Sequence, residues 1–256
     1  MKINTKTTSI VLLVGGTGSR FSSIKEPPKQ LSKLNNDYVL MHIIKHLKKY
    51  GLNHFIFPLG FKKNFFEKFF YSKQNIKKYK FNILNKNFKK IDVKKNKVNI
   101  SLFDAGKNSN KMSRIIKSLK YIIDKDLMIV YGDDLSNIKI NQIFKKYNYF
   151  KKKKAIVTIF KKRSQYGHVI ADKNNFVKKF LEKPIFENPI NIGNYLISSS
   201  LIKKFKSKHE IETHLLPKLS KKKLLLSHEH KGYFFSINDK KELILAKKKL
   251  KKKNEK

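Results

Sequence analysis

Cysteine is absent from the 256-residue sequence. Disulfide bonds, thiolate metal ligands and a thiol nucleophile are therefore excluded. Long apolar runs are missing as well. The stretch from Ile10 to Val14 is far too short to cross a bilayer, and Arg20 follows too closely for a secretory signal. We therefore expect a cytoplasmic protein with no membrane span.

Arginine is scarce although the chain is strongly basic. Sixty basic residues oppose 18 acidic ones, for a net charge of +42, yet only Arg20, Arg114 and Arg163 are arginines. Such a charge is typical of nucleic-acid binding, and a basic nucleic-acid binder is one hypothesis. Arginine, however, is the residue preferred for bidentate recognition of phosphates and bases. Abundant Lys, Asn, Ile, Phe and Tyr indicate a bias toward A/T-rich codons, so we expect no nucleic-acid partner.

The apolar content is sufficient for a folded core. Hydrophobic residues make up 40% of the chain, including 20 Phe and 11 Tyr. Short apolar segments alternate with amphipathic ones, which predicts βαβ units and an α/β fold with a mostly parallel, mixed sheet flanked by helices. The expected strands cover residues 9–14, 54–58, 97–103, 127–131 and 155–160, and the expected helices cover 39–50, 63–70, 111–123 and 139–150.

The second half has shorter elements. We expect strands at 176–181, 190–198, 224–227 and 233–237, with helices near Leu201, Glu212 and Glu242. No linker divides the chain, so we expect a single domain over residues 1–246 followed by a lysine-rich tail at 247–256. Residues 72–97 are the hardest to interpret, and they could form a lid, an oligomerisation arm or a mobile insertion.

A glycine-rich turn follows the first expected strand. It contains Gly15, Gly16 and Gly18 and ends at Arg20. Backbone N–H groups in such a turn can approach a phosphate closely, and a cation strengthens the site. The spacing matches neither a dinucleotide fingerprint nor a Walker loop. Two prolines then present Lys29 toward the same strand end, which favours a polyphosphate site over a plain tight turn.

A pair of acidic residues, Asp133 and Asp134, follows the strand that ends at Tyr131. Ligands of open α/β sheets bind at the carboxyl ends of strands, and a carboxylate there can hold Mg²⁺ against substrate phosphates. The alternative is an ordinary turn.

Glu182 and Lys183 precede a proline at the end of a further expected strand. An acid and a base at such a position can hold a sugar hydroxyl and a phosphate. The alternative is a surface ion pair. His42 and His46, four residues apart on a helix, have the spacing of metal ligands but no third partner, so we expect structural roles for them.

Taken in order, these motifs resemble the sugar-phosphate nucleotidyltransferase family. The opening is similar to that family's Gly-Gly-x-Gly-Thr-Arg signature with its Pro-Lys-Pro element. The Asp-Ala-Gly ending at Gly106, the Met-Ser-Arg ending at Arg114, and Tyr-Gly-Asp resemble segments of the cytidylyltransferases that use glucose 1-phosphate. Tyr-Gly at Gly167, Glu-Lys-Pro, and Asn-Ile-Gly from Asn191 follow in matching order.

The resemblance implies a Rossmann-like fold and a reaction in the synthesis of surface polysaccharides. A sugar 1-phosphate attacks a nucleoside triphosphate, and an NDP-sugar and pyrophosphate form. CTP and glucose 1-phosphate are the implied substrates, Mg²⁺ the implied cofactor and a homo-oligomer the implied assembly. The nucleotide-binding half would cover about residues 1–135 and the sugar-phosphate half about 136–246.

The resemblance also implies a role for each matching residue. Catalytic roles fall to Arg20, Lys29 and Asp133, nucleotide binding to Gly15, Gly16, Gly18, Gly106 and Arg114, sugar-phosphate binding to Gly167, Glu182, Lys183 and Asn191, and metal binding to Asp133 and Asn238.

The chain departs from the family pattern in three of these motifs. Asn238 stands where a second metal-binding aspartate is usual, with Asp239 one residue beyond. Met112 and Ser113 replace two glycines, and Gln30 replaces a proline. A neutral amide ligates through its oxygen but offsets no charge. These changes leave three possibilities: an active enzyme, an enzyme for another sugar, or a catalytically weakened nucleotide-binding or regulatory homologue.

Overall fold

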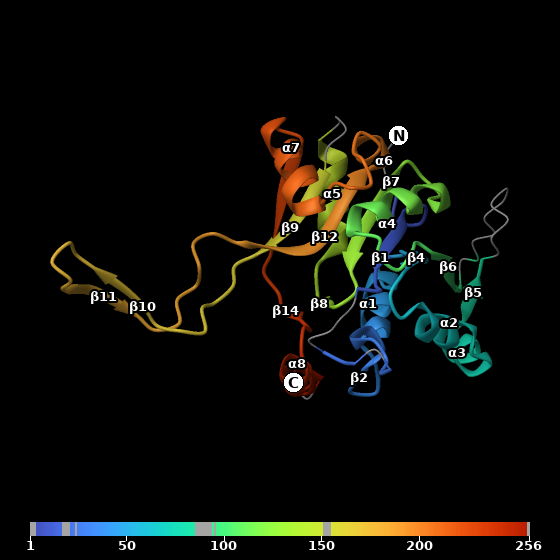
Figure 1. The fold of residues 1–256 in the computed structure, drawn as a ribbon, viewed down its shortest axis with the longest axis horizontal. Helices are drawn as coiled ribbons and strands as arrows, with labels where there is room; N and C mark the ends of the chain where they lie inside the picture. Colours follow the sequence, from blue (N-terminus) through green and yellow to red (C-terminus); the bar gives the residue numbers. More distant parts are fainter. Residues whose placement is uncertain are drawn as a thin grey trace.

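An eight-stranded sheet organises the chain in the computed structural model (Figure 1). Its order is β13-β9-β12-β7-β1-β4-β6-β5, and β12 runs antiparallel to both of its neighbours while the other pairs are parallel. This mixed, mostly parallel α/β sheet confirms the expected fold class. The structure describes residues 4–16, 21–23, 25–84, 94, 96–150 and 155–254, with side chains up to residue 251.

The elements follow the expected alternation. The strands are β1 Ser9–Leu13, β2 Lys33–Leu34, β3 Asp37–Tyr38, β4 His54–Leu59, β5 Phe81–Ile83, β6 Val98–Asp104, β7 Asp126–Tyr131, β8 Asp134–Ser136, β9 Ala155–Phe160, β10 His168–Ala171, β11 Val177–Leu181, β12 Ile190–Ser198, β13 Leu225–His230 and β14 Phe234–Ser236. The helices are η1 Lys29–Leu31, α1 Val39–Lys48, α2 Lys63–Tyr71, α3 Lys73–Tyr79, α4 Lys111–Ser118, η2 Leu119–Tyr121, α5 Ile140–Tyr149, α6 Ser199–Ile202, η3 Ile211–Leu215, α7 Leu216–Lys221 and α8 Lys240–Asn254.

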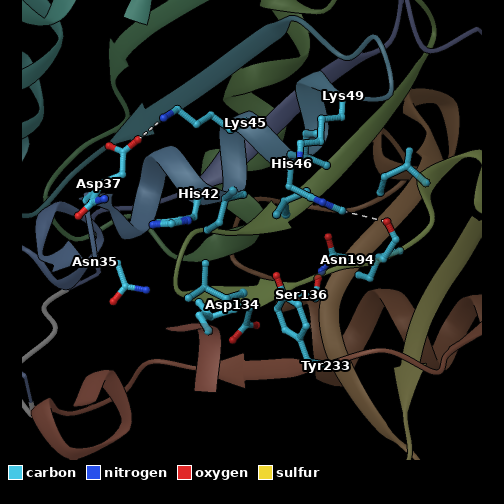
Figure 2. A pocket seen from close by; sticks show the side chains of 18 residues that line it. Asn35, Asp37, His42, Lys45, His46, Lys49, Asp134, Ser136, Asn194 and Tyr233 are labelled. Atoms are coloured by element: carbon cyan, nitrogen blue, oxygen red, sulfur yellow. Dashed lines mark hydrogen bonds and ion pairs between the residues drawn. The ribbon is translucent and has the colours of Figure 1, made fainter. Parts of the chain in front are cut away.

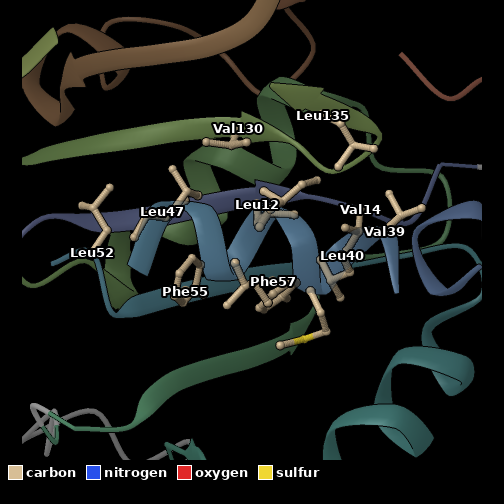
Figure 3. Packing of buried hydrophobic residues seen from close by; sticks show 14 of the residues in the cluster. Leu12, Val14, Val39, Leu40, Leu47, Leu52, Phe55, Phe57, Val130 and Leu135 are labelled. Atoms are coloured by element: carbon tan, nitrogen blue, oxygen red, sulfur yellow. The ribbon is translucent and has the colours of Figure 1, made fainter. Parts of the chain in front are cut away.

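Alternation along β1 divides the core into two layers. Ile10, Leu12 and Val14 point to one face, where α1, α2, α5 and α8 pack, while Val11 and Leu13 point to the other, beneath α4, α6 and α7. Figure 3 shows the first layer, in which the apolar stripe of α1 lies against β1, β4 and β7. Because both faces are covered, the central strands are mostly apolar, and ligands can reach the sheet only at its ends.

A long β-ribbon leaves the sheet between β9 and β12. The Lys162 carbonyl accepts from Phe186 N–H (2.9 Å), the Pro184 carbonyl accepts from Ser164 N–H (2.7 Å), and the pairing continues into the β10–β11 hairpin. We call residues 161–189 the arm. In Figure 1 it projects away from the sheet and its helices.

The structure differs from the expectation in several places. The helix expected over 111–123 ends at Ser118 and continues as a short 3-10 turn, and β10 was not anticipated. The described part of segment 72–97 contains α3 and the edge strand β5, so Phe81 contributes to the core; residues 85–93 and 95 lie outside the described part. The tail, by contrast, is expected to be a solvated helix end and is helical as far as residue 254, where α8 ends. No helix within the described ranges is long and apolar enough to cross a membrane.

Candidate functional site

The carboxyl ends of β1, β4 and β6 bring three glycines together. Gly15 follows β1 with φ +90°, and Gly106 follows β6 with φ +97°, a region that favours glycine. Gly60 follows β4, and a Cβ placed on it would lie 2.6 Å from the Nη2 atom of Arg114 and 3.1 Å from the Gly106 carbonyl oxygen. Nothing lies within 4 Å of a Cβ built on Gly16. The backbone here is therefore open on one side and closely packed on the other.

The side chain of Arg114 packs against this glycine cluster. Its Nη1 donates to the carbonyl of Val14 (2.9 Å) and its Nε donates to the Ser109 hydroxyl (3.1 Å). The side chain is buried, and this burial lowers the pKa of its guanidinium. This buried arginine bonds the end of β1 and so orients the Gly15–Gly16 turn. Arg114 lies on α4, and the N-terminus of that helix is capped by Asn110, whose side chain accepts from Ser113 N–H (2.8 Å).

Asp133 lies at the end of the neighbouring strand, β7, facing a lysine and an amide. Its Oδ2 is 2.5 Å from Lys29 Nζ, which also donates to Asn238 Oδ1 at 3.5 Å. The side chains of Lys29 and Asp133 are 13% and 25% exposed. A hydrogen bond from Gly132 N–H to the Leu13 carbonyl (3.0 Å) joins this group to the end of β1.

Local sequence explains why Lys29 and Asn238 meet. Pro28 begins the turn η1, and its carbonyl accepts from Leu31 N–H, which holds Lys29 at the first position of the turn. Asp239 caps α8 by accepting from Glu242 N–H (2.8 Å), while the Glu242 carboxylate accepts from Asn238 N–H (2.6 Å). Asp239 is therefore occupied as a helix cap.

The amide of Asn238 is oriented toward the cation. Its Nδ2 donates to the Ser236 hydroxyl (3.1 Å), which leaves Oδ1 facing Lys29. Side-chain oxygens of Asp133 and Asn238 thus lie around the position of the Lys29 ammonium. These two oxygen ligands are of the kind that Mg²⁺ prefers. Over the described ranges, no three His, Cys, Asp or Glu side chains gather to bind a metal unaided. Such a pair suits an ion held largely by substrate phosphates.

Asp134 is the buried neighbour of this group. It begins β8, which pairs with β14 so that Asp134 lies opposite Ser236. Burial, and secondarily the negative charge of Asp133, raise the pKa of Asp134 to about 7. Its carboxyl also limits the residue at position 193, because a Cβ on Gly193 would lie 2.8 Å from Asp134 Oδ2 and 2.6 Å from the Tyr131 ring.

A hydrogen-bonded tyrosine pair extends the site toward β12. Asn191 Nδ2 donates to the Tyr195 hydroxyl (2.6 Å), Tyr195 to that of Tyr131 (3.3 Å), and Tyr131 to Glu212 (2.6 Å). Lys111 contacts both Tyr131 and Glu212. Burial raises the pKa of both tyrosines, that of Tyr195 to about 12, so they remain neutral hydrogen-bonding groups.

The structure does not bring every predicted site residue to this edge. Gly167, Glu182 and Lys183 lie on the arm, which projects away from β7 in Figure 1. Glu182 and Lys183 form an exposed ion pair (3.2 Å) there. Gly18 and Arg20 lie outside the described residues. Lys29, Asp133, Asn191, Asn238, Gly15, Gly16, Gly106 and Arg114 are gathered at the strand ends.

A cavity of about 420 Å³ lies beside α1, and Asp134 is among the residues that line it (Figure 2). His42 and His46 line it, and their Nε2 atoms bond the carbonyls of Leu34 (2.8 Å) and Ile138 (2.9 Å). Both histidines therefore serve the structural roles that the sequence favoured. Burial lowers the pKa of His46.

Three residues at this edge, Gly60, Glu212 and Lys111, were not predicted from the sequence. Gly60 had a detectable signal, because it directly follows a buried strand, and Gly15 and Gly106 lie two residues beyond the ends of theirs. Glu212 and Lys111 had none, because their contact joins α4 to the distant η3 segment.

The Gly15–Gly16 turn and the Asp133 carboxylate lie at the carboxyl ends of parallel strands, which is the edge at which open α/β sheets bind their ligands. Residues 9–240 match the family model described as nucleotidyl transferase. The chain belongs to this family.

Three relatives illustrate the range of similarity. A probable glucose-1-phosphate cytidylyltransferase of Bacillus subtilis (strain 168) is 28% identical, covering 91% of this chain and 92% of the relative. A D-glycero-alpha-D-manno-heptose 1-phosphate guanylyltransferase of Campylobacter jejuni subsp. jejuni serotype O:2 is 26% identical over 76% of this chain and 78% of its own. The chain spans 61% of the catalytic subunit beta of mannose-1-phosphate guanylyltransferase of Drosophila melanogaster, at 22% identity and 93% coverage of this chain.

Solved structures share the fold. A UDP-glucose pyrophosphorylase crystallised with UDP-glucose superposes with a TM-score of 0.69 at 19% identity, covering 96% of this chain and 99% of that one. HddC from Yersinia pseudotuberculosis gives 0.65 at 18% identity, with 95% and 99% coverage. At these identities the likeness concerns the fold alone.

Proposed function

We propose that the protein is a sugar-1-phosphate nucleotidyltransferase that uses CTP and glucose 1-phosphate. Family membership supports the reaction class, and the relative from B. subtilis supports this substrate pair over the guanylyl donors of the other relatives. The observation that carries the proposal is the Lys29–Asp133–Asn238 group, beside the Gly15–Gly16 turn.

The reaction requires alignment and charge neutralisation more than covalent chemistry. A phosphate oxygen of the sugar phosphate attacks the α-phosphorus of CTP, a new P–O bond forms, and the bond to pyrophosphate breaks. The N–H groups of Gly15, Gly16 and Gly18 would hold the nucleotide phosphates, Gly106 would lie on the nucleotide side, and Arg114 would keep the turn in place.

Lys29 would be the cation beside the reacting α-phosphate in this arrangement. Its ammonium would move from Asp133 to the α-phosphate and stabilise the charge that develops there. Arg20 would hold the departing pyrophosphate. Asp133 and Asn238 would hold Mg²⁺, which supplies positive charge to the phosphates. Asn191, fixed by Tyr195, would contact the sugar phosphate.

A second candidate is a catalytically weakened nucleotide-binding or regulatory homologue. The neutral Asn238, at a position where a carboxylate is usual in the family, favours it. This candidate predicts nucleotide binding without pyrophosphate release. The orientation of the Asn238 oxygen toward Lys29 supports the active enzyme instead.

Pyrophosphate release tests the proposal. CTP, UTP, dTTP, GTP and ATP are each combined with a panel of sugar 1-phosphates, with Mg²⁺ or with EDTA. We expect metal-dependent release with CTP and glucose 1-phosphate, and loss of release in Asp133→Ala with an unchanged circular dichroism spectrum. Release with another pair would correct the substrates. Nucleotide binding with no release from any pair would establish the weakened homologue.

A further inference from the structure

The side-chain amide of Asn238 can ligate a cation in only one of two orientations. A half-turn about the last side-chain bond exchanges its oxygen and its NH₂ group, and only the oxygen is a metal ligand. The backbone around it is fixed. Ile237 N–H donates to the Asp133 carbonyl (2.9 Å), and the Glu242 carboxylate accepts from the N–H of the next residue (2.6 Å). The orientation of the amide is therefore decided by its side-chain partners.

Lys29 does not fix this orientation throughout the proposed reaction. Its contact with Asn238 Oδ1 is long (3.5 Å), and its closer contact is with Asp133 (2.5 Å). In the proposed reaction the Lys29 ammonium moves to the α-phosphate and no longer holds the amide. Among the described side chains, the partner that then remains is the Ser236 hydroxyl, which accepts from Asn238 Nδ2 at 3.1 Å.

A hydroxyl group alone does not distinguish the two ends of an amide. It can accept from the NH₂ group, or it can donate its single proton to the oxygen. Asp134 removes this choice. Its carboxylate accepts the proton of Ser236, which lies directly opposite it in the β8–β14 pair. Because that proton is already donated, Ser236 can only accept from Asn238, and Oδ1 is left facing Lys29.

Asp134 is buried without a cation of its own. The residue is 8% exposed and lies among the side chains that line the cavity beside α1 (Figure 2). None of the ion pairs between described side chains includes it. Burying a carboxylate without a cationic partner costs stability, so its presence calls for a benefit elsewhere. Its hydrogen bond to Ser236, two residues before Asn238, places that benefit in the site.

We infer that Asp134 is a positioning residue for metal binding, and that it acts through Ser236 to hold the Asn238 oxygen toward the position of the ion. The inference rests on the proposed function for the metal, and on hydrogen bonds and strand register for the orientation. It explains how a neutral side chain can serve at position 238. A carboxylate presents an oxygen in either orientation, whereas an amide needs neighbouring residues to select one.

Hydrogen exchange of the Asn238 side-chain amide, followed by NMR at pH 8, tests the orientation without metal or turnover. The NH₂ resonances are assigned by their absence from the spectrum of Asn238→Asp. We expect exchange with water to be at least three-fold faster in both Ser236→Ala and Asp134→Ala, because Nδ2 then loses its fixed acceptor. Ser136→Ala removes a hydroxyl from β8, opposite Phe234, and should leave the exchange unchanged. Unchanged exchange in Asp134→Ala would overturn the inference.

Metal binding is measured with Mn²⁺ as the probe. Mn²⁺ is titrated into protein with CTP and no sugar phosphate, and bound Mn²⁺ is followed by electron paramagnetic resonance against a blank of CTP alone. Ser236→Ala should weaken Mn²⁺ binding about ten-fold, because outer hydrogen bonds orient the ligands of a metal. Ser236→Thr, which keeps the hydroxyl, and Ser136→Ala should bind Mn²⁺ as the wild-type protein does.

The Asn238→Asp background separates positioning from support of the strand. A carboxylate presents an equivalent oxygen after a half-turn, so Ser236→Ala should cause no further loss of Mn²⁺ binding there. An equal loss in both backgrounds would show that Ser236 supports the strand rather than the amide, and would overturn the inference. A wild-type protein that binds Mn²⁺ and CTP but releases no pyrophosphate would count against the proposed function alone, because amide exchange would still decide the orientation.

Discussion

The ammonium of Lys29 lies 2.5 Å from the carboxylate of Asp133, across the ends of two segments that are remote in the sequence. Lys29 follows two prolines, and Asp133 follows a buried strand. In the proposed reaction, the Lys29 ammonium exchanges this carboxylate for a substrate phosphate. It also supplies a direct test of the site.

Replacing Lys29 separates catalysis from stability. Lys29→Ala should lower kcat/KM about 10²- to 10³-fold, because in the proposed reaction it removes the cation that stabilises the reacting phosphates. Its effect on unfolding free energy should stay within about 1 kcal/mol, since the pair is partly exposed. Lys63→Ala, which breaks the exposed Lys63–Asp104 pair at the same edge, is the control. Equal losses of activity in both variants would argue against a special role for Lys29.

Restoring the carboxylate at position 238 should strengthen metal binding. Asn238→Asp should lower the Mg²⁺ concentration for half-maximal pyrophosphate release by about ten-fold, because a second charge then faces the ion. Asn174→Asp adds the same charge at the tip of the arm and should leave this concentration unchanged. An unaltered Mg²⁺ dependence in Asn238→Asp would show that position 238 does not bind the metal.

A methyl group on Gly60 should disturb the Gly15–Gly16 turn through Arg114, which packs against both. Its Cβ would lie 2.6 Å from Arg114 Nη2, so the guanidinium must shift, which strains its hydrogen bond to the Val14 carbonyl. Gly60→Ala should weaken CTP binding about ten-fold by calorimetry, and Arg114→Lys should do the same. Because both act on one contact, the double variant should lose little more than either single one. Additive losses would contradict this coupling.

Asp134 should destabilise the protein progressively between about pH 4 and pH 7. Burial raises its pKa to about 7 in the folded state, so the unfolded chain releases the proton first as the pH rises. The cost is absent below the unfolded pKa and complete above pH 7. Asp134→Asn should therefore gain stability on the order of 2 kcal/mol at pH 8, with no comparable gain at pH 4. Thermal unfolding across this range measures the difference, and a gain independent of pH would contradict it.

His54 should give the opposite pH dependence. It is buried between the hydroxyls of Ser9 (2.9 Å) and Ser101 (3.0 Å), and burial lowers its pKa to about 4. Below pH 6.5 the unfolded chain binds a proton that the folded chain does not, so stability falls as the pH drops from 6.5 to 4. In His54→Asn, the melting temperature should fall less steeply over this interval. Parallel slopes in both proteins would exclude His54 as a source of acid sensitivity.

Local patterns were reliable for the elements that lie in the sheet. The apolar segments at β1, β4, β7 and β9 are buried on both faces, so their composition alone distinguishes them from the helices between. β10 was missed because its residues are exposed and carry no burial pattern. The secondary structure of segment 72–97 could not be predicted, because the short elements α3 and β5 in its described part depend on packing against the sheet edge.

The sequence by itself determined the α/β class and the residues that follow each buried strand, because alternation and glycine spacing are local properties of the chain. These local properties indicated Gly15 and Asp133 as candidate site residues, and the resemblance to the family added Gly106. Only the tertiary structure decided which of these meet. It placed Lys29 between Asp133 and Asn238, assigned Asp239 to a helix cap, and carried Glu182 and Lys183 away on the arm. Such contacts depend on the order of strands and the direction of a ribbon, which long-range packing sets and no short stretch of sequence encodes.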